Sequence, residues 1–186
     1  MILPGAFNPP TRAHFTLARA ALAHADAVLF TVPGTLPHKE FTGASLDQRL
    51  TMLARITAED ERLGTAVADG GLYADIAREA REYFPNVRIT LLCGRDAAER
   101  IVEWPYCEPG VVERMLSECE LLVASRDGAY YPPAHLSSRI RILEAPNLDE
   151  YSSTRLREML ARGENWRDLA PEGIVDLIAE IYVAHA

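Results

Sequence analysis

Residues 1–14 read MILPGAFNPPTRAH and carry the strongest fold signal in the chain. An apolar start, a glycine with a proline-rich turn, and a run of helical character indicate a strand, a loop and a helix. The glycine lets backbone amides approach an anion closely, and the helix start adds unpaired amides and the positive end of a dipole. His14 lies one turn into the helix, on its inward stripe. The stretch therefore predicts an anion-binding turn after the first strand of a parallel sheet.

The rest of the chain alternates short apolar runs with helical segments, which favours parallel strands joined by helices. The expected strands are 1–3, 27–32, 87–93, 121–124 and 140–143. Three residues are few for the first strand of a parallel sheet. We therefore expect either a truncated first strand or a start codon placed too late.

Helices are expected where apolar residues recur at helical spacing. The expected stretches are 13–25, the stripe of Leu46, Leu50, Leu53 and Ala54, and the stripe of Ile174, Leu177, Ile178 and Ile181 after Pro171. A further helix is expected from about Thr154 to Gly163, because glycine can take the left-handed cap conformation. The charged residues of 78–82 are interpreted as a solvated helix face.

The length of 186 residues predicts a single domain over residues 1–186. Three cysteines cannot all pair with one another and are too scattered for a zinc site, and the sequence shows neither a signal-peptide pattern nor a membrane-length apolar run. We therefore expect a cytoplasmic protein with no membrane partner. The formal net charge of −8 argues against nucleic acid as a partner, so phosphate must be bound locally. The sequence leaves a homo-oligomer open.

A second phosphate-binding pattern, YSSTRLR at residues 151–157, follows the expected strand 140–143. Hydroxyls and amides at a helix N-terminus, with an arginine one turn on, can bind several phosphate oxygens. Both patterns follow strands, so in a parallel sheet both lie at the carboxyl edge, where ligands of open α/β folds bind. Each has a structural alternative when taken alone. His14 would be a packed histidine without a ligand, and Ser152 or Ser153 an ordinary helix N-cap.

These patterns resemble the signature of the HIGH-type nucleotidyltransferases, and within them the nicotinate and nicotinamide mononucleotide adenylyltransferases. The two end motifs are Gly-x-Phe-x-Pro-x-Thr-x-x-His at 5–14 and Ser-Ser-Thr-x-Leu-Arg at 152–157. Interior segments match the family in the same order: Pro37-His38-Lys39 with Arg49, Gly94-Arg95-Asp96 with Trp104, and Ser125-Arg126. The resemblance covers nearly the whole chain and implies a Rossmann-like α/β fold of nucleotidyltransferase type, with helices on both faces of a parallel sheet.

The resemblance implies adenylyl transfer from ATP to nicotinate or nicotinamide mononucleotide, which yields the dinucleotide and pyrophosphate in NAD biosynthesis. In-line attack of one phosphate on another needs no covalent enzyme intermediate, so positioning and charge neutralisation supply the rate. Mg²⁺ is expected to bridge phosphate oxygens and to be held mainly by substrate and water, without a protein metal site.

The family resemblance also assigns roles to individual residues. The implied catalytic residues are Thr11, His14, Lys39 and Arg157. The implied ATP-binding residues are Gly5, Ala6, Phe7, His14, Gly94, Asp96, Ser153, Thr154 and Arg157. The implied mononucleotide-binding residues are Asn8, Lys39, Tyr73, Trp104 and Arg126. Among these, Gly94 and Asp96 would contact the ATP ribose, and Trp104 would stack on the pyridine ring.

The interior residues have structural alternatives from sequence alone. Asp96 could cap a helix, Trp104 could be a core aromatic, and Lys39 and Arg49 could be solvated surface charges. Three histidines match no motif and are interpreted as structural or surface residues: His24, His135 and His185.

Two departures from the family pattern bear on the function. Thr11 stands where the superfamily often has histidine; it can donate a hydrogen bond but carries no charge. In the stretch 71–75, Tyr73 is kept, but Leu72 and Ala74 replace flanking hydroxyls, which leaves the acceptor open between nicotinate, nicotinamide and another mononucleotide. The alternative functions are an adenylyl- or cytidylyltransferase for phosphopantetheine or a polyol phosphate, and a catalytically silent nucleotide-binding module.

Overall fold

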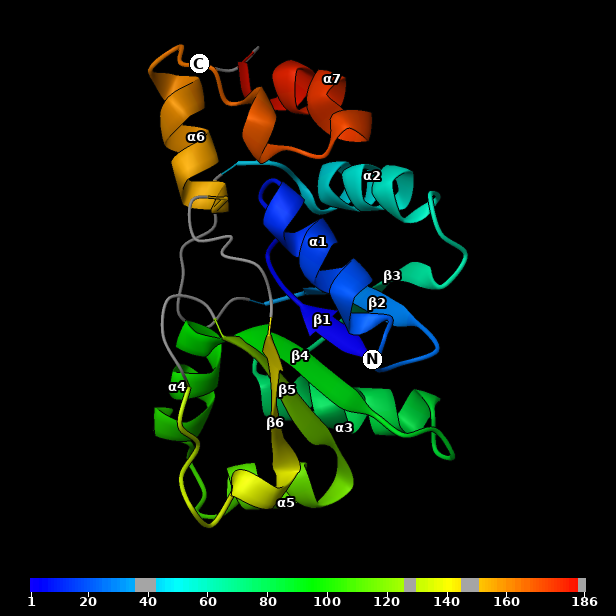
Figure 1. Ribbon diagram of the computed structural model, residues 1–186, viewed down its shortest axis with the longest axis vertical. Helices are drawn as coiled ribbons and strands as arrows, with labels where there is room; N and C mark the ends of the chain where they lie inside the picture. Colours follow the sequence, from blue (N-terminus) through cyan, green and yellow to red (C-terminus); the bar gives the residue numbers. More distant parts are fainter. Residues whose placement is uncertain (36–42, 126–129, 145–150, 184–186) are drawn as a thin grey trace.

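The described residues of the computed structural model, 1–35, 43–125, 130–144 and 151–183, form one sheet whose paired strands are all parallel. Its strands are β1 (Ile2–Pro4), β2 (Val28–Pro33), β3 (Leu63–Ala68), β4 (Thr90–Gly94), β5 (Glu120–Ser125) and β6 (Ile140–Glu144). The strand order is β3-β2-β1-β4-β5-β6 (Figure 1). The chain thus proceeds outward from β1 in one direction and then from β4 in the other. This order confirms the Rossmann-like prediction and puts the reversal between β1 and β4.

Helices cover both faces of the sheet (Figure 1). One face carries α1 (Arg12–Ala21), α2 (Leu46–Thr57), α6 (Ser153–Ala161) and α7 (Val175–Ile178). The other carries α3 (Tyr73–Tyr83), α4 (Arg95–Glu103) and α5 (Val111–Glu118). Shorter turns are η1 (Ser137–Arg139), η2 (Arg167–Leu169), η3 (Glu172–Ile174) and the π-helical η4 (Ala179–Val183). None of the helices in these ranges is long and apolar enough to cross a membrane.

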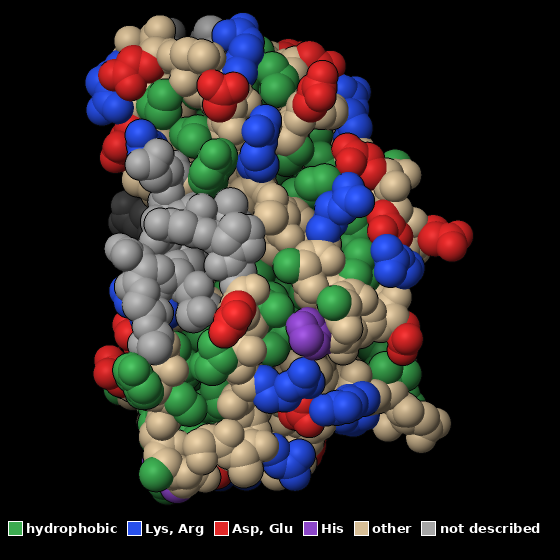
Figure 2. All heavy atoms as spheres, in the orientation of Figure 1, with side chains coloured by type: hydrophobic (Ala, Val, Ile, Leu, Met, Phe, Trp, Pro, Cys, Tyr) green, Lys and Arg blue, Asp and Glu red, His purple; other side chains and the backbone are tan. Residues whose placement is uncertain are grey.

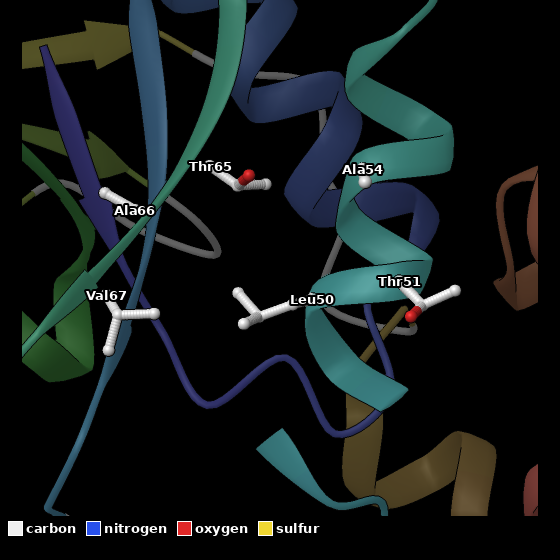
Figure 3. Close-up of a pocket in the computed structure, with 6 residues that line it drawn as sticks. All are labelled: Leu50, Thr51, Ala54, Thr65, Ala66 and Val67. Carbon is white, nitrogen blue, oxygen red and sulfur yellow. The ribbon is translucent and has the colours of Figure 1, made fainter. Parts of the chain in front are cut away.

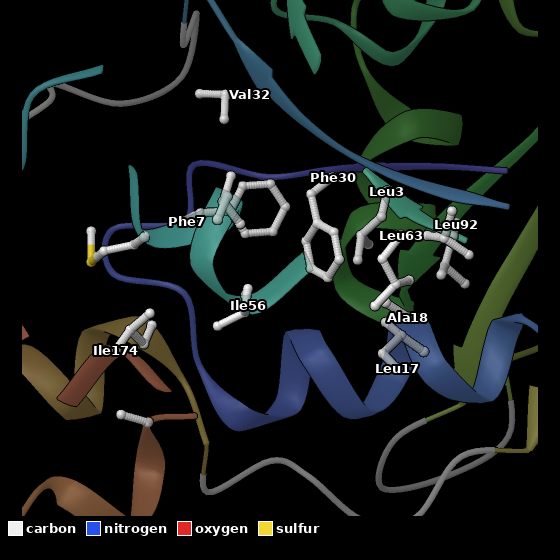
Figure 4. Close-up of a cluster of buried hydrophobic side chains, with 14 of the residues drawn as sticks. Leu3, Phe7, Leu17, Ala18, Phe30, Val32, Ile56, Leu63, Leu92 and Ile174 are labelled. Atoms are coloured by element: carbon white, nitrogen blue, oxygen red, sulfur yellow. The ribbon is translucent and has the colours of Figure 1, made fainter. Parts of the chain in front are cut away.

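The central strands β1, β4 and β5 are mostly apolar because each supplies both cores. In β5, Leu122 and Ala124 enter the core under α1 and α2, whereas Leu121 and Val123 enter the core under α3 to α5. Successive side chains of a strand point to opposite faces, and a strand buried on both faces is therefore a continuous apolar run. Figure 4 shows the first core, in which Phe30 packs near residues of β1 and α1.

The sequence prediction missed β3, which lies at the edge of the sheet. Its sequence is LGTAVA, and only Leu63 and Ala68 are buried. Small residues with one exposed face give neither a continuous apolar run nor a strong β-branched signal. The first strand has three residues, Ile2–Pro4, in agreement with the expectation of a short strand.

Three helix predictions differ from the structure in detail. The first helix, α1, ends at Ala21 rather than at Ala25. The buried face of α2 contains Met52 and Ile56, while Ala54 is exposed. The expected C-terminal helix is divided into η3, α7 and η4, with Pro171 preceding η3. By contrast, α6 spans 153–161 and is followed by Gly163 with φ of 66°, so its predicted position and glycine stop are confirmed.

Candidate active site

The loop between β1 and α1 continues the sheet and then turns sharply inward. The amide of Gly5 donates to the carbonyl oxygen of Thr31 at 3.1 Å, which extends the pairing of β1 with β2. Phe7 has φ of 48°, an uncommon value for a residue other than glycine. Its ring is fully buried and contacts the ring of Phe30 edge to face, with centroids 5.5 Å apart (Figure 4). It also contacts the ring of His14 edge to face, with centroids 5.1 Å apart. The buried ring therefore anchors the turn.

The carbonyl groups of this loop are held by side chains from α2 and α6. Arg49 of α2 donates to the carbonyl of Ala6 at 3.0 Å, and Ser153 of α6 donates to the carbonyl of Pro9 at 2.8 Å. Arg157 of α6 donates to the carbonyl of Asn8. Because C=O and N–H of a trans peptide point in opposite directions, the amide that follows Ala6 is directed away from Arg49. The loop is thus fixed by contacts distant in sequence.

Thr11 and His14 form a hydrogen-bonded pair at the start of α1. Thr11 is the N-cap residue and is fully buried. Its amide lies 3.0 Å from Nδ1 of His14, and its hydroxyl lies 2.8 Å from the same nitrogen. A backbone N–H can only donate, so Nδ1 is an acceptor and the proton of the neutral ring is assigned to Nε2. The half-buried His14 therefore has an N–H donor on the side of its ring opposite Thr11.

The start of α6 combines a helix cap with contacts to the first loop. Ser152 is the N-cap, and its hydroxyl accepts from the amide of Arg155 at 3.1 Å. The capping alternative is therefore confirmed for Ser152, while Ser153 bonds the N-terminal loop. Arg157 also donates to the hydroxyl of Thr154 at 3.4 Å. The two predicted phosphate-binding segments, 5–14 and 152–157, are therefore joined at the carboxyl edge of the sheet.

Gly94 and Asp96 lie where β4 passes into α4, beside the reversal of the strand order. Gly94 is the N-cap of α4, so the alternative of Asp96 as a cap is wrong. The Asp96 side chain is 85% exposed, and its carboxylate lies 3.8 Å from Nε of Arg95. Its carboxylate therefore faces solvent, at the edge of the sheet where ligands of open α/β folds bind.

A narrow slot with aromatic walls lies between the start of α3 and the end of α4. Its free volume is about 60 Å³, and it is lined by Gly71, Leu72, Tyr73, Ala97, Arg100, Ile101, Trp104 and Tyr106. Trp104 is partly exposed, so the alternative of a core aromatic is wrong. Burial raises the pKa of the Tyr73 hydroxyl well above its ordinary value, and burial also raises the pKa of Tyr106. The structure therefore brings Tyr73 and Trp104, both predicted for the mononucleotide, into one lining.

The segment before the slot is held by Glu79 of α3. Its carboxylate accepts from the amides of Asp69 and Gly70, each at 2.8 Å. A Cβ atom at Gly70 would lie 2.3 Å from the Cβ of Asp75, so only glycine fits there. Arg81 donates to the carbonyls of four residues beyond α3: Phe84, Pro85, Val87 and Glu118. The prediction of a merely solvated face is therefore wrong for Glu79 and Arg81.

A larger hollow, of about 430 Å³, lies between α2 and the edge strand β3 (Figure 3). It is lined by Leu50, Thr51, Ala54, Thr65, Ala66 and Val67. The lining has no charged or acid–base side chain, and none of the predicted site residues belongs to it. It is therefore not the candidate site. On the face drawn in Figure 2, acidic and basic side chains are interspersed, which fits the net charge of −8 and local rather than extended phosphate binding.

Asn8 has contacts that the sequence did not predict. It is buried, and its side-chain oxygen accepts from the amide of Ala44 at 3.2 Å and from the hydroxyl of Tyr182 in η4. Arg49 is also buried, so the alternative of a solvated surface charge is wrong for it. Tyr182 and Arg49 both donate hydrogen bonds to the loop from segments distant in sequence. No local sequence pattern predicts these contacts.

Several predicted residues do not join this site or cannot be placed. Lys39, Arg126 and His185 lie outside the described residues. His24 and His135 are exposed and lie near Arg141 and Glu113 respectively, in line with the prediction of surface residues.

Comparison with known proteins identifies the family of this chain. The family model described as cytidylyltransferase-like matches residues 2–159. A protein of Gloeobacter violaceus named probable nicotinate-nucleotide adenylyltransferase is 32% identical over 95% of this chain and 91% of its own. A protein of the same name from Neisseria meningitidis serogroup B is 30% identical, over 95% of this chain and 93% of its own.

A solved structure shows the same fold. Plasmodium falciparum nicotinic acid mononucleotide adenylyltransferase, complexed with NaAD, superimposes with a TM-score of 0.71 over 96% of this chain and 93% of its own, at 18% identity. At this identity the likeness concerns the fold, while the family match and the curated relatives concern the sequence. The chain therefore belongs to the cytidylyltransferase-like family, and within it to the group of the nicotinate-nucleotide adenylyltransferases.

Proposed function

We propose that this protein transfers the adenylyl group of ATP to nicotinate mononucleotide, giving the dinucleotide and pyrophosphate in NAD biosynthesis. The observation that carries the proposal is the junction of the two phosphate-binding segments. Ser153 and Arg157 bond the carbonyls of Pro9 and Asn8, 144 and 149 residues away in sequence. Two helix N-termini thereby meet at the carboxyl edge of a parallel sheet, and the names of the relatives favour a nicotinate acceptor.

The reaction joins two phosphates without a covalent enzyme intermediate. A phosphate oxygen of the mononucleotide attacks the α-phosphorus of ATP, and the bond to the β-phosphate oxygen breaks to release pyrophosphate. The Nε2–H of His14 would donate to an oxygen on which charge develops, with Thr11 fixing the ring. Ser153, Thr154 and Arg157 would contact the triphosphate from α6. The protein thus contributes positioning and hydrogen-bond donors.

The two nucleosides would lie on either side of this phosphate region. Gly94 and Asp96 are proposed to contact the ATP ribose, and Tyr73 and Trp104 the pyridine ring. A cavity of about 150 Å³ holds benzene, so a slot of about 60 Å³ must widen to accept a ring. Trp104 lies at the end of α4 and is partly exposed, so rotation of its ring can widen the slot.

We propose that Mg²⁺ accompanies the triphosphate and is held by phosphate oxygens and water. In the ranges that the structure describes, no group of three or more His, Cys, Asp and Glu is arranged to bind a metal ion. We therefore propose that the substrate carries the cation, since Mg²⁺ keeps several waters and often binds through phosphates. When bound, the ion would neutralise charge on the phosphates. Residues 1–186 would act as a single domain in the cytoplasm.

The proposal is tested by pyrophosphate release from ATP and Mg²⁺. Nicotinate mononucleotide, nicotinamide mononucleotide and phosphopantetheine are offered separately, and the expected result is fastest release with nicotinate mononucleotide. Fastest release with phosphopantetheine would assign the protein to another acceptor. Tight ATP binding by calorimetry, with no pyrophosphate release from any acceptor, would show a nucleotide-binding module without catalysis.

A further inference from the structure

The aromatic slot beside α4 has one charged side chain in its lining, Arg100. The other lining residues are glycine, alanine, leucine, isoleucine, two tyrosines and a tryptophan. Flat aromatic walls suit a planar ring, and an apolar surrounding strengthens any charge interaction at the rim. The lining therefore suits a ring that carries an anionic substituent.

The position of Arg100 on α4 directs its charge to this slot. It lies three residues after Ala97, which also lines the slot, and residues three apart share one face of a helix. Its Nε donates to the carbonyl of Asp96 at 3.2 Å, which holds the side chain along the helix. Within the described ranges, its two terminal nitrogens make no hydrogen bond, so their donors remain for a ligand. Burial and Cys93 raise the pKa of the Tyr73 hydroxyl, and Arg100 acts in the opposite direction, so its charge reaches the slot wall.

Two other polar groups near the slot, those of Tyr106 and Asp75, are engaged with the protein. The hydroxyl of Tyr106 donates to the carbonyl of Ile101 at 3.2 Å. The carboxylate of Asp75, which raises the pKa of Tyr106, lies 3.6 Å from the guanidinium of Arg78. Arg100 is therefore the cationic donor best placed for a substituent of a ring in the slot.

We propose that Arg100 binds the carboxylate of the pyridine ring and thereby selects nicotinate over nicotinamide mononucleotide. An arginine fork can donate two parallel hydrogen bonds to a carboxylate, and these are stronger than hydrogen bonds between neutral groups. A carboxamide has one oxygen acceptor and no charge, so it gains less from the same side chain. This inference rests on the proposed function and names the residue that sets its acceptor.

Arg100→Met tests the inference because it removes the cation and keeps an unbranched apolar stem. For nicotinate mononucleotide, kcat/KM is expected to fall by about 10- to 100-fold, the size of a lost hydrogen bond to a charged group. For nicotinamide mononucleotide it should change by less than about twofold, because that acceptor lacks the carboxylate. Arg100→Lys should give an intermediate value for nicotinate mononucleotide, since it keeps the charge and loses the fork.

Arg78→Met is the matched control, because Arg78 is another cation near the slot but does not belong to its lining. The two acceptors differ only in the substituent of the pyridine ring. Loss of a cation outside the lining should therefore affect both acceptors alike. Equal losses for both acceptors in Arg100→Met would overturn the inference and leave the proposed function intact. A wild-type preference for nicotinamide mononucleotide would overturn both the inference and the nicotinate acceptor of the proposed function. If the wild-type protein turns over neither pyridine mononucleotide, both the proposed function and this inference are wrong.

Discussion

Replacing Arg49 by methionine should loosen the loop of residues 5–11. Arg49 is 7% exposed, and it donates to the carbonyls of Ala6 at 3.0 Å and of Ser45 at 3.3 Å. Leaving the Ala6 carbonyl without its donor should cost about 1–3 kcal/mol. Burial lowers the pKa of Arg49, and removal of this buried cation recovers part of its desolvation cost. We expect a net loss of about 2 kcal/mol, or about 4–8 °C in Tm for a domain of this size.

Denaturant unfolding of the purified variants measures this loss, and calorimetry measures ATP affinity. Arg55→Met is the control on the same helix: the Arg55 side chain is 47% exposed and pairs with the exposed Asp176 at 2.9 Å. A surface pair of this kind is worth less than about 1 kcal/mol. Arg49→Met should also weaken ATP binding, whereas Arg55→Met should not. If both variants lose the same stability and bind ATP equally well, Arg49 does not support the loop.

His14→Ala should lower kcat by about a hundredfold or more with little change in Tm, because in the proposed mechanism His14 donates to the developing charge; full-rate turnover would exclude His14 from the mechanism. Of the three thiols, exposed Cys107 should react fastest with a thiol reagent at pH 8. Cys93 and Cys119 should react slowly, because burial raises the pKa of Cys93, and that of Cys119 to about 11. Equal reaction rates for all three thiols would contradict the burial of Cys93 and Cys119. The side chain of Arg62 lowers the pKa of Asp60 from 3.8 to about 2, so the stability that this carboxylate contributes should be complete above pH 3.8 and lost as the pH falls through 2. Acid titration of Asp60→Asn against the wild type measures this, and an unchanged difference in stability down to pH 2 would contradict it.

The central strands could be predicted because both of their faces are buried. Leu121 and Val123 face one core and Leu122 the other, so β5 is an apolar run in the sequence. The edge strand β3 has no such run, since Thr65 and Val67 are exposed. Packing of η3 against α2 and of η4 against α6, rather than a uniform helical pattern, shapes the segment after Pro171. Edges and irregular turns depend on tertiary contacts that a local pattern does not contain.

The site divides in the same way. Thr11, His14 and the serines of 152–153 are local signals, because capping and anion binding depend on the start of a single helix. Arg49 and Tyr182 act on a loop that is remote in sequence, and their partners are a backbone carbonyl and an amide side chain. The sequence around either residue contains no signal for such a partner, so these two contacts could be found only in the fold.

The hydrogen bonds from α6 and η4 to the first loop have a consequence for biosynthesis. Asn8 leaves the ribosome long before its partners Arg157 and Tyr182, which lie 149 and 174 residues further along the chain. The loop therefore cannot acquire its final geometry while the chain is still growing through α5 and β6. A chain terminated before α6 would therefore lack the formed loop. The loop geometry thus arises only after α6 and η4 have been synthesised and have met the loop between β1 and α1.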